Sequence, residues 1–130
     1  MILEVSIRSR SREELINIDS HVRDIIDRSG IKDGALTVFV PHTTAAVTIN
    51  ENADPTVVAD ILYKLGDLIP KRDRYRHREG NSDAHVKASL CGNSETILVS
   101  GGKPVLGTWQ SVYFCEFDGP RTRRVIMRLD

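Results

Sequence analysis

Three short stretches of the chain carry side chains that can transfer protons, hold a metal ion or orient a polar substrate. They are residues 41–55, residues 81–85 and residues 107–110. The first has His42 at its head and Asn50, Glu51 and Asn52 at its tail, with mainly apolar and β-branched residues between them. A strand that only fills a core needs no imidazole, carboxylate or amides. We therefore expect the fold to bring these three stretches together.

Two histidines and one carboxylate from these stretches suit a facial site for a divalent cation. His42 follows a strand-ending proline and should project from the end of a buried strand. Asp83 and His85 are two residues apart, so an extended segment would place both side chains on one face. The spacing matches no specific metal motif, and histidines are also common in metal-free polar networks. A metal site of His42, Asp83 and His85 and a satisfied polar network remain alternatives.

The remaining polar groups suit substrate binding and proton transfer. Glu51 could serve as a general base or a metal ligand, while the amides of Asn50 and Asn52 could orient a polar substrate. Local turn hydrogen bonding explains the same residues without any function. Trp109 could form a stacking wall beside Gln110, although a single Trp in a small protein usually lies in the core.

Composition restricts the class of protein. A chain of 130 residues is long enough for one hydrophobic core, so we expect a single domain over residues 1–130. It has 18 basic and 18 acidic side chains, and this zero net charge argues against nucleic acid as a partner. Residues 71–79 are locally basic, with five Lys and Arg against two acids. They predict a solvated loop or a phosphate clamp.

The sequence predicts a cytoplasmic protein with no membrane partner. Its apolar runs are too short to cross a bilayer, and its N-terminus lacks the features of a secretory signal. The two cysteines, Cys91 and Cys115, have no C-x-x-C spacing, so we expect both to be reduced, strand-borne and structural. A nucleophilic Cys91 with a histidine base is the functional alternative.

Hydrophobic periodicity predicts two main helices and six or seven strands. Helical spacing appears over residues 18–26, before Gly30, and again over residues 58–68, after Asp54 and Pro55 as cap and first residue. The predicted strands cover residues 2–8, 35–40, 44–49, 86–90, 96–100, 111–117 and 123–129. The first should be an edge strand and the second a central strand. This pattern is typical of an α+β protein with antiparallel sheets.

Five motifs, in order and spacing, resemble the YjbQ-like family. They are PHTTA at 41–45, INENADP at 49–55 with Asp60, NSDAH at 81–85, GTWQ at 107–110 and DGPRTR at 118–123. The resemblance covers essentially the whole chain. It implies a compact antiparallel β-sandwich with helices that assembles as a homotrimer. The apolar character of both faces of residues 112–117 also favours assembly.

The resemblance also implies an activity and a set of site residues. The family is labelled secondary thiamine-phosphate synthase, a transferase activity in which a pyrimidine diphosphate loses diphosphate to a thiazole phosphate. The implied catalytic residues are His42, Asn50, Glu51 and Gln110. The implied substrate-binding residues are Asn52, Asn81, Trp109, Arg121 and Arg123. The implied metal ligands are His42, Asp83 and His85. Asp54 and Asp60 are further functional candidates to which the resemblance gives no specific role.

Together these observations predict an enzyme-like pocket that binds a divalent metal and a small phosphorylated substrate. Two imidazoles match zinc or manganese better than magnesium, the usual partner of diphosphate. We therefore expect any coupling activity to be weak. A metal-dependent hydrolase and a non-catalytic small-anion binding module are the alternatives.

Overall fold

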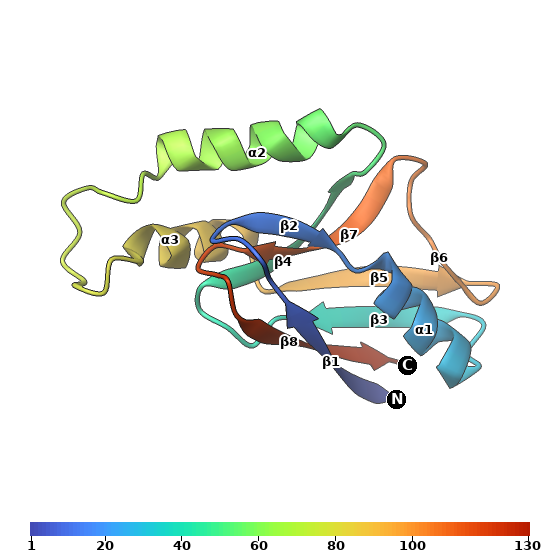
Figure 1. The fold of residues 1–130 in the computed structure, drawn as a ribbon. Helices are drawn as coiled ribbons and strands as arrows, with labels where there is room; N and C mark the ends of the chain where they lie inside the picture. Colours follow the sequence, from blue (N-terminus) through green and yellow to red (C-terminus); the bar gives the residue numbers. More distant parts are fainter.

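In the computed structural model, which describes all residues 1–130, the chain forms eight strands and three helices (Figure 1). In chain order they are β1 (Ile2–Arg8), β2 (Glu14–Asn17), α1 (Asp19–Ser29), β3 (Gly34–Phe39), β4 (Ala45–Glu51), α2 (Pro55–Leu68), α3 (Ser82–Cys91), β5 (Ser94–Ser100), β6 (Lys103–Pro104), β7 (Gln110–Glu116) and β8 (Thr122–Leu129). The strands make two sheets. One has the order β1-β8-β3-β5-β6 and the other β2-β7-β4, with antiparallel pairing throughout. The α+β class with antiparallel sheets is thus confirmed.

The main hydrophobic core lies between the two sheets and α1. Strands β3, β5 and β8 of the larger sheet alternate buried and exposed residues, so each turns one apolar face inward. From the smaller sheet, Val47 and Phe114 reach the same cluster, and α1 adds Val22, Ile25 and Ile26. The helix ends at Gly30, whose φ of 68° is the left-handed conformation that glycine adopts without strain.

A second, smaller hydrophobic cluster covers the other face of the smaller sheet. It consists of Ala46, Ala84, Ala88, Cys115 and Phe117. Helix α3 provides its alanines, and two leucines of α2 pack at its margin. Strand β7 therefore has partners on both faces within one chain, because alternate residues enter the two clusters. The apolar faces of residues 112–117 need no second subunit to cover them, so this pattern does not support the predicted trimer.

Helix α2 is the outermost element in Figure 1, and none of its residues is fully buried. Its start agrees with the prediction, since the Asp54 carboxylate accepts a hydrogen bond from the Thr56 amide at 2.9 Å and Pro55 is the first helical residue. No helix of the structure has the length and apolar character required to span a membrane.

Several predicted elements are confirmed, and one is wrong. β1 is an edge strand and β3 is central, as expected. Residues 86–90, predicted as a strand, belong to helix α3, and the fold has three helices rather than two main ones. Cys91 consequently ends a helix, and only Cys115 lies on a strand. The short strands β2 and β6 were not predicted, because each has too few residues for a clear alternation.

Candidate functional site

His42 lies in the connection between β3 and β4 and is held in place by β8. Its Nε2 atom accepts a hydrogen bond from the backbone amide of Arg124 at 3.0 Å. An acceptor at Nε2 must carry a lone pair, so the proton of the neutral ring is on Nδ1. Burial, together with the nearby Arg123 charge, lowers the pKa of His42 below its ordinary value. His42 is therefore a neutral imidazole with an Nδ1–H donor at neutral pH.

His85 reaches the same region from helix α3. The ring of His77, in the connection between α2 and α3, meets the His85 ring edge to face, with centroids 5.5 Å apart and planes at 89°. The connection is itself fixed by the Tyr75 hydroxyl, which donates to the Pro70 carbonyl at 2.6 Å. The basic stretch 71–79 is thus adjacent to one of the two predicted site histidines.

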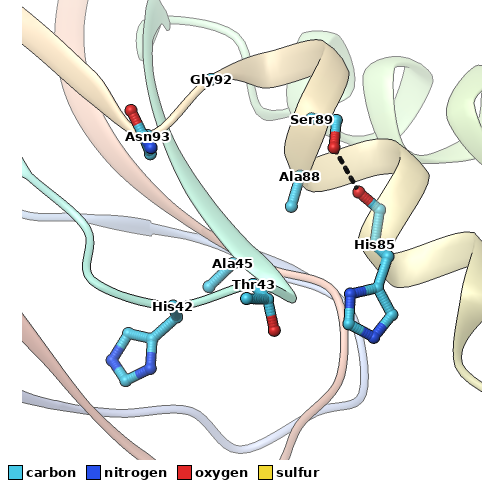
Figure 2. A pocket seen from close by; sticks show the side chains of 8 residues that line it. All are labelled: His42, Thr43, Ala45, His85, Ala88, Ser89, Gly92 and Asn93. Carbon is cyan, nitrogen blue, oxygen red and sulfur yellow. Dashed lines mark hydrogen bonds between the residues drawn. The ribbon is translucent and has the colours of Figure 1, made fainter.

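A cavity of about 520 Å³ separates the two histidines (Figure 2). Its walls are His42, Thr43, Ala45, His85, Ala88, Ser89, Gly92 and Asn93. Figure 2 shows the His42 and His85 rings on opposite sides of this space, with Thr43 between them. A second hollow of about 390 Å³ also includes His42 and His85, and reaches Asn81, Asp118 and Arg121. The structure thus brings the first and second sequence stretches together, as predicted.

Two arginines predicted to bind substrate have different environments. The Arg121 side chain is half exposed and lies in the second hollow, where its Nε donates to the Asp118 carbonyl at 3.0 Å and its Nη2 pairs with the Asp118 carboxylate at 3.3 Å. Arg123 is buried and paired with the Glu116 carboxylate, and it also donates to Thr44 Oγ1 at 2.9 Å. Burial alone would favour a neutral Glu116, but the bonds from Arg123 and Ser9 hold its pKa below the usual value. Both arginines are therefore paired, and the half-exposed Arg121 is the one that a ligand can reach, while the buried Arg123 supports the wall of the site.

Asn81 has one unused polar atom beside the histidines. Its Nδ2 donates to the Asp118 carboxylate at 2.9 Å, which orients the amide. Its Oδ1 is buried and has no hydrogen-bond partner. A buried acceptor without a donor is uncommon in proteins, so this oxygen is a candidate contact for a ligand N–H or O–H group.

Asp83 does not face the histidine cavity, and the prediction that Asp83 and His85 share a face is wrong. Residues two apart on a helix are about 200° apart around its axis, whereas on a strand they would be aligned. The Asp83 carboxylate is fully buried and accepts from Arg12 Nη2 at 3.0 Å and Lys87 Nζ at 3.2 Å. Despite its burial, these two cations hold the pKa of Asp83 below its ordinary value. Asp83 therefore belongs to a buried ion-pair network with Arg12 and Lys87 that supports the structure.

The predicted metal-ligand set therefore does not fit one chain. No group of three or more His, Cys, Asp or Glu side chains is placed to hold a metal ion. In addition, the Nε2 lone pair of His42 is already used by the Arg124 amide. A bound divalent metal stays a prediction that would need ligands beyond His42 and His85.

The other predicted site residues lie at the far end of β4. They are Asn50, Glu51, Asn52, Trp109 and Gln110. The Tyr113 hydroxyl contacts the Glu51 carbonyl at 3.1 Å and Asn52 Oδ1 at 3.0 Å, while Gln110 Oε1 accepts the Gly107 amide at 2.8 Å. Strand β4 is seven residues long, so its Glu51 end lies roughly 20 Å from the end that follows His42. The third sequence stretch is thus not part of the histidine cavity within one chain.

Several cavity residues were not singled out from the sequence. Ser89 and Asn93 line the cavity, but a serine late in an unrecognised helix and an asparagine in a turn carry no specific signal. Arg76 and His77 line an adjoining hollow of about 390 Å³ that ends on His85. The only signal for these two residues was the charge of stretch 71–79, for which a phosphate clamp was one of two alternatives.

Comparison with known proteins gives a consistent assignment. The family model described as UPF0047 protein YjbQ-like matches residues 3–129. The chain belongs to this family. UPF0047 protein MJ1081 of Methanocaldococcus jannaschii is 50% identical over 129 residues, which cover 99% of this chain and 94% of that protein. UPF0047 protein YugU of Bacillus subtilis is 44% identical over 130 residues, covering 99% of this chain and 98% of that one.

Solved structures of YjbQ-like proteins have the same fold. A crystal structure of a YjbQ/UPF0047 protein from Clostridium acetobutylicum matches with a TM-score of 0.97 at 50% identity, covering 98% of this chain and 99% of that one. A YbjQ-like protein of unknown function from Sulfolobus solfataricus matches with a TM-score of 0.95 at 32% identity, covering 99% and 95%. The resemblance inferred from the five motifs is thus confirmed as family membership, while the thiamine-phosphate activity stays a prediction.

Proposed function

We propose that this YjbQ-like protein binds a small phosphorylated or otherwise anionic molecule in the cavity between His42 and His85. The observation that carries the proposal is the hydrogen bond from the Arg124 amide to His42 Nε2. It fixes His42 as an Nδ1–H donor, and a fixed donor is what an oxyanion requires. Thr43 adds a hydroxyl group to the same cavity, and a hydroxyl group can also donate to a phosphate oxygen, whereas the Ser89 hydroxyl already donates its proton to the His85 carbonyl at 2.9 Å.

The charge around the cavity also favours an anion. None of the five basic residues of stretch 71–79 makes an ion pair, although the chain as a whole has no net charge. Arg76 and His77 approach His85 from one side, and Arg121 lies in the hollow on the other. Arg121 is paired with the Asp118 carboxylate, so the free guanidinium beside the site is that of Arg76, and a free guanidinium attracts and orients phosphate.

The same groups suit proton transfer or the stabilisation of a departing phosphate. His85 is an imidazole on the opposite wall from His42, so a bound oxyanion could contact both rings. The weak thiamine-phosphate coupling expected from the family resemblance would use the site in this way, since the departing diphosphate needs hydrogen-bond donors and positive charge. We regard this coupling as one candidate reaction of the cavity.

The experiment is a binding titration monitored by NMR. Inorganic phosphate and pyrophosphate would be added to the wild-type protein and to the His42→Ala, His85→Ala and His21→Ala variants. We expect shifts of cavity amides in the wild type, at least tenfold weaker binding in the first two variants, and unchanged binding in His21→Ala, which alters a helix away from the cavity. Binding that is equal in all four proteins would overturn the proposal.

Glu51→Gln provides a second control, because it removes a carboxylate at the far end of β4 and preserves its shape. We expect phosphate binding by this variant to equal that of the wild type. A loss comparable with His42→Ala would mean that Glu51 takes part in the site, which one chain alone does not allow.

A further inference from the structure

The two cysteines form a pair that the proposed binding site does not use. Cys91 is the last residue of α3 and Cys115 lies in β7, and both are free thiols. They meet in the smaller hydrophobic cluster, where Cys91 is partly exposed and Cys115 is buried. One thiol is thus accessible from solvent, while the other is enclosed beside it.

Backbone hydrogen bonds hold the two cysteines in this arrangement. Cys115 is paired with Ala46 across the β4–β7 ladder. The next residue of β4, Val47, donates its amide to the Gly92 carbonyl at 3.1 Å, so the residue that follows Cys91 is bonded to β4. The Gly92 amide in turn donates to the Ala88 carbonyl at 2.9 Å, which closes the last turn of α3. Sheet register and helix end together place Cys91 against the small cluster that contains Cys115.

The environments of the two thiols assign them different chemical roles. Contact with the Cys115 side chain lowers the pKa of Cys91, although burial opposes this effect. The same contact and burial both raise the pKa of Cys115. Peroxide can reach the partly exposed Cys91 sulfur and not the buried Cys115 sulfur, so Cys91 is the nucleophile and the enclosed sulfur is positioned to react second.

We infer that Cys91 and Cys115 are a peroxide-oxidisable dithiol that closes to an intramolecular disulfide. The Cys91 thiolate attacks one oxygen of hydrogen peroxide, the O–O bond breaks, and Cys91 becomes a sulfenic acid with release of hydroxide. The Cys115 sulfur then attacks the Cys91 sulfur, the S–O bond breaks, and water leaves with the Cys115 proton. Two thiols lose two electrons in total, and peroxide is reduced to two molecules of water.

This oxidation would act on the histidine cavity, a step that depends on the proposed function. Ser89, two residues before Cys91, and Gly92, which follows it, both line the cavity between His42 and His85. A covalent link from Cys91 to β7 restrains the end of the helix that carries His85. We expect the disulfide form to bind phosphate with an affinity different from that of the reduced form.

The test treats the native protein with a small excess of hydrogen peroxide and measures intact mass and free thiols after denaturation. We expect the loss of both thiols and a mass decrease of two hydrogen atoms per chain. Cys91→Ser should keep its remaining thiol under the same conditions, and Cys115→Ser should give a Cys91 sulfenic acid that dimedone traps.

Other outcomes would overturn the inference. If wild-type Cys91 accumulates as sulfinic acid, or if the disulfide links two chains, Cys115 is not the resolving thiol. If both thiols survive peroxide, the pair is structural. None of these readouts depends on phosphate binding, so a negative result for the cavity leaves the dithiol test intact.

Discussion

At the scale of single residues, His42 combines a fixed position with a fixed protonation state. Its neutral form accepts the Arg124 amide, and its pKa is lowered by burial and by Arg123. The unfolded chain regains the ordinary histidine pKa of about 6.5. As pH falls below that value, the unfolded state binds the proton first, so the free energy of unfolding decreases until the pH passes the lower folded-state pKa.

The lowered pKa of His42 predicts how the free energy of unfolding changes with pH. We expect the free energy of unfolding to decrease between about pH 7 and pH 5 in the wild type, and to decrease less in His42→Gln, which has no titrating ring. Urea unfolding followed by circular dichroism at a series of pH values would measure the difference. Equal slopes for the two proteins would contradict a neutral, partly buried His42.

Asp83 is predicted to matter for stability and not for ligand binding. Replacement by Ala leaves Lys87 buried without one of its two carboxylate partners, Asp83 and Glu13, and we expect a loss of about 3–5 kcal/mol in the free energy of unfolding. Asp67→Ala removes the exposed pair with Lys64 and should cost at most about 1 kcal/mol. Denaturant unfolding of both variants makes the comparison. A small effect at Asp83 would reopen its assignment as a ligand.

Of the three residues predicted to bind a metal, the sequence correctly placed the two histidines in one site and misplaced the aspartate. His42 and His85 were chosen as polar groups without a structural need, and they lie on the same cavity. Asp83 was chosen by the same argument but has a structural need, since it neutralises Arg12 and Lys87. Arg12 is 71 residues from Asp83, and a partner this distant cannot be identified from local spacing. The sequence therefore did not show that Asp83 is used in an ion pair away from the two histidines.

At the scale of secondary structure, α3 shows the limit of hydrophobic periodicity. Its buried positions are Asp83, Ala84, Lys87 and Ala88, which repeat at helical spacing but are not strongly apolar. Two of them are charged side chains that satisfy each other one turn apart. A method that counts apolar residues misses such a face, whereas α1, with Val22, Ile25 and Ile26 buried, was predicted correctly.

Strand β4 explains why the third sequence stretch is separate. The sequence identified a strand with His42 before it and Glu51 at its end. It did not show that the strand keeps these two groups apart, at its opposite ends. The stretch 107–110 then joins the Glu51 end, because β7 runs antiparallel to β4 and pairs Gln110 with Glu51. The pairing of β4 with β7, two strands far apart in sequence, therefore determines which predicted residues lie together.

Helix α2 has the weakest attachment, and its cap should control local opening. The Asp54 carboxylate accepts both the amide and the hydroxyl of Thr56, while no residue of the helix is fully buried. In Asp54→Ala we expect faster amide hydrogen exchange in the first turns of α2 and unchanged exchange in β3 and β8. Exchange measured by NMR tests this. Acceleration throughout the protein would mean that α2 supports the whole fold.

At the scale of the whole molecule, the homotrimer stays a prediction that rests on the family resemblance. The apolar residues of β7 are covered within the chain, but Phe39 and Leu98 are exposed on the larger sheet, Leu98 by 61%. Exposed apolar side chains of this kind are candidates for a subunit contact. Light scattering should give three times the chain mass of 14.5 kDa, and a monomer at micromolar concentration would contradict it.

The position of β7 between two hydrophobic clusters has a consequence for how the protein unfolds. Phe114 points into one cluster and Cys115 into the other, so neither can be exposed to water without disturbing the strand that serves both. The two clusters should therefore melt in a single cooperative transition, with tertiary and secondary structure lost at the same temperature. Damage confined to the small cluster beneath α3 would lower that common temperature and would not create a partly folded intermediate.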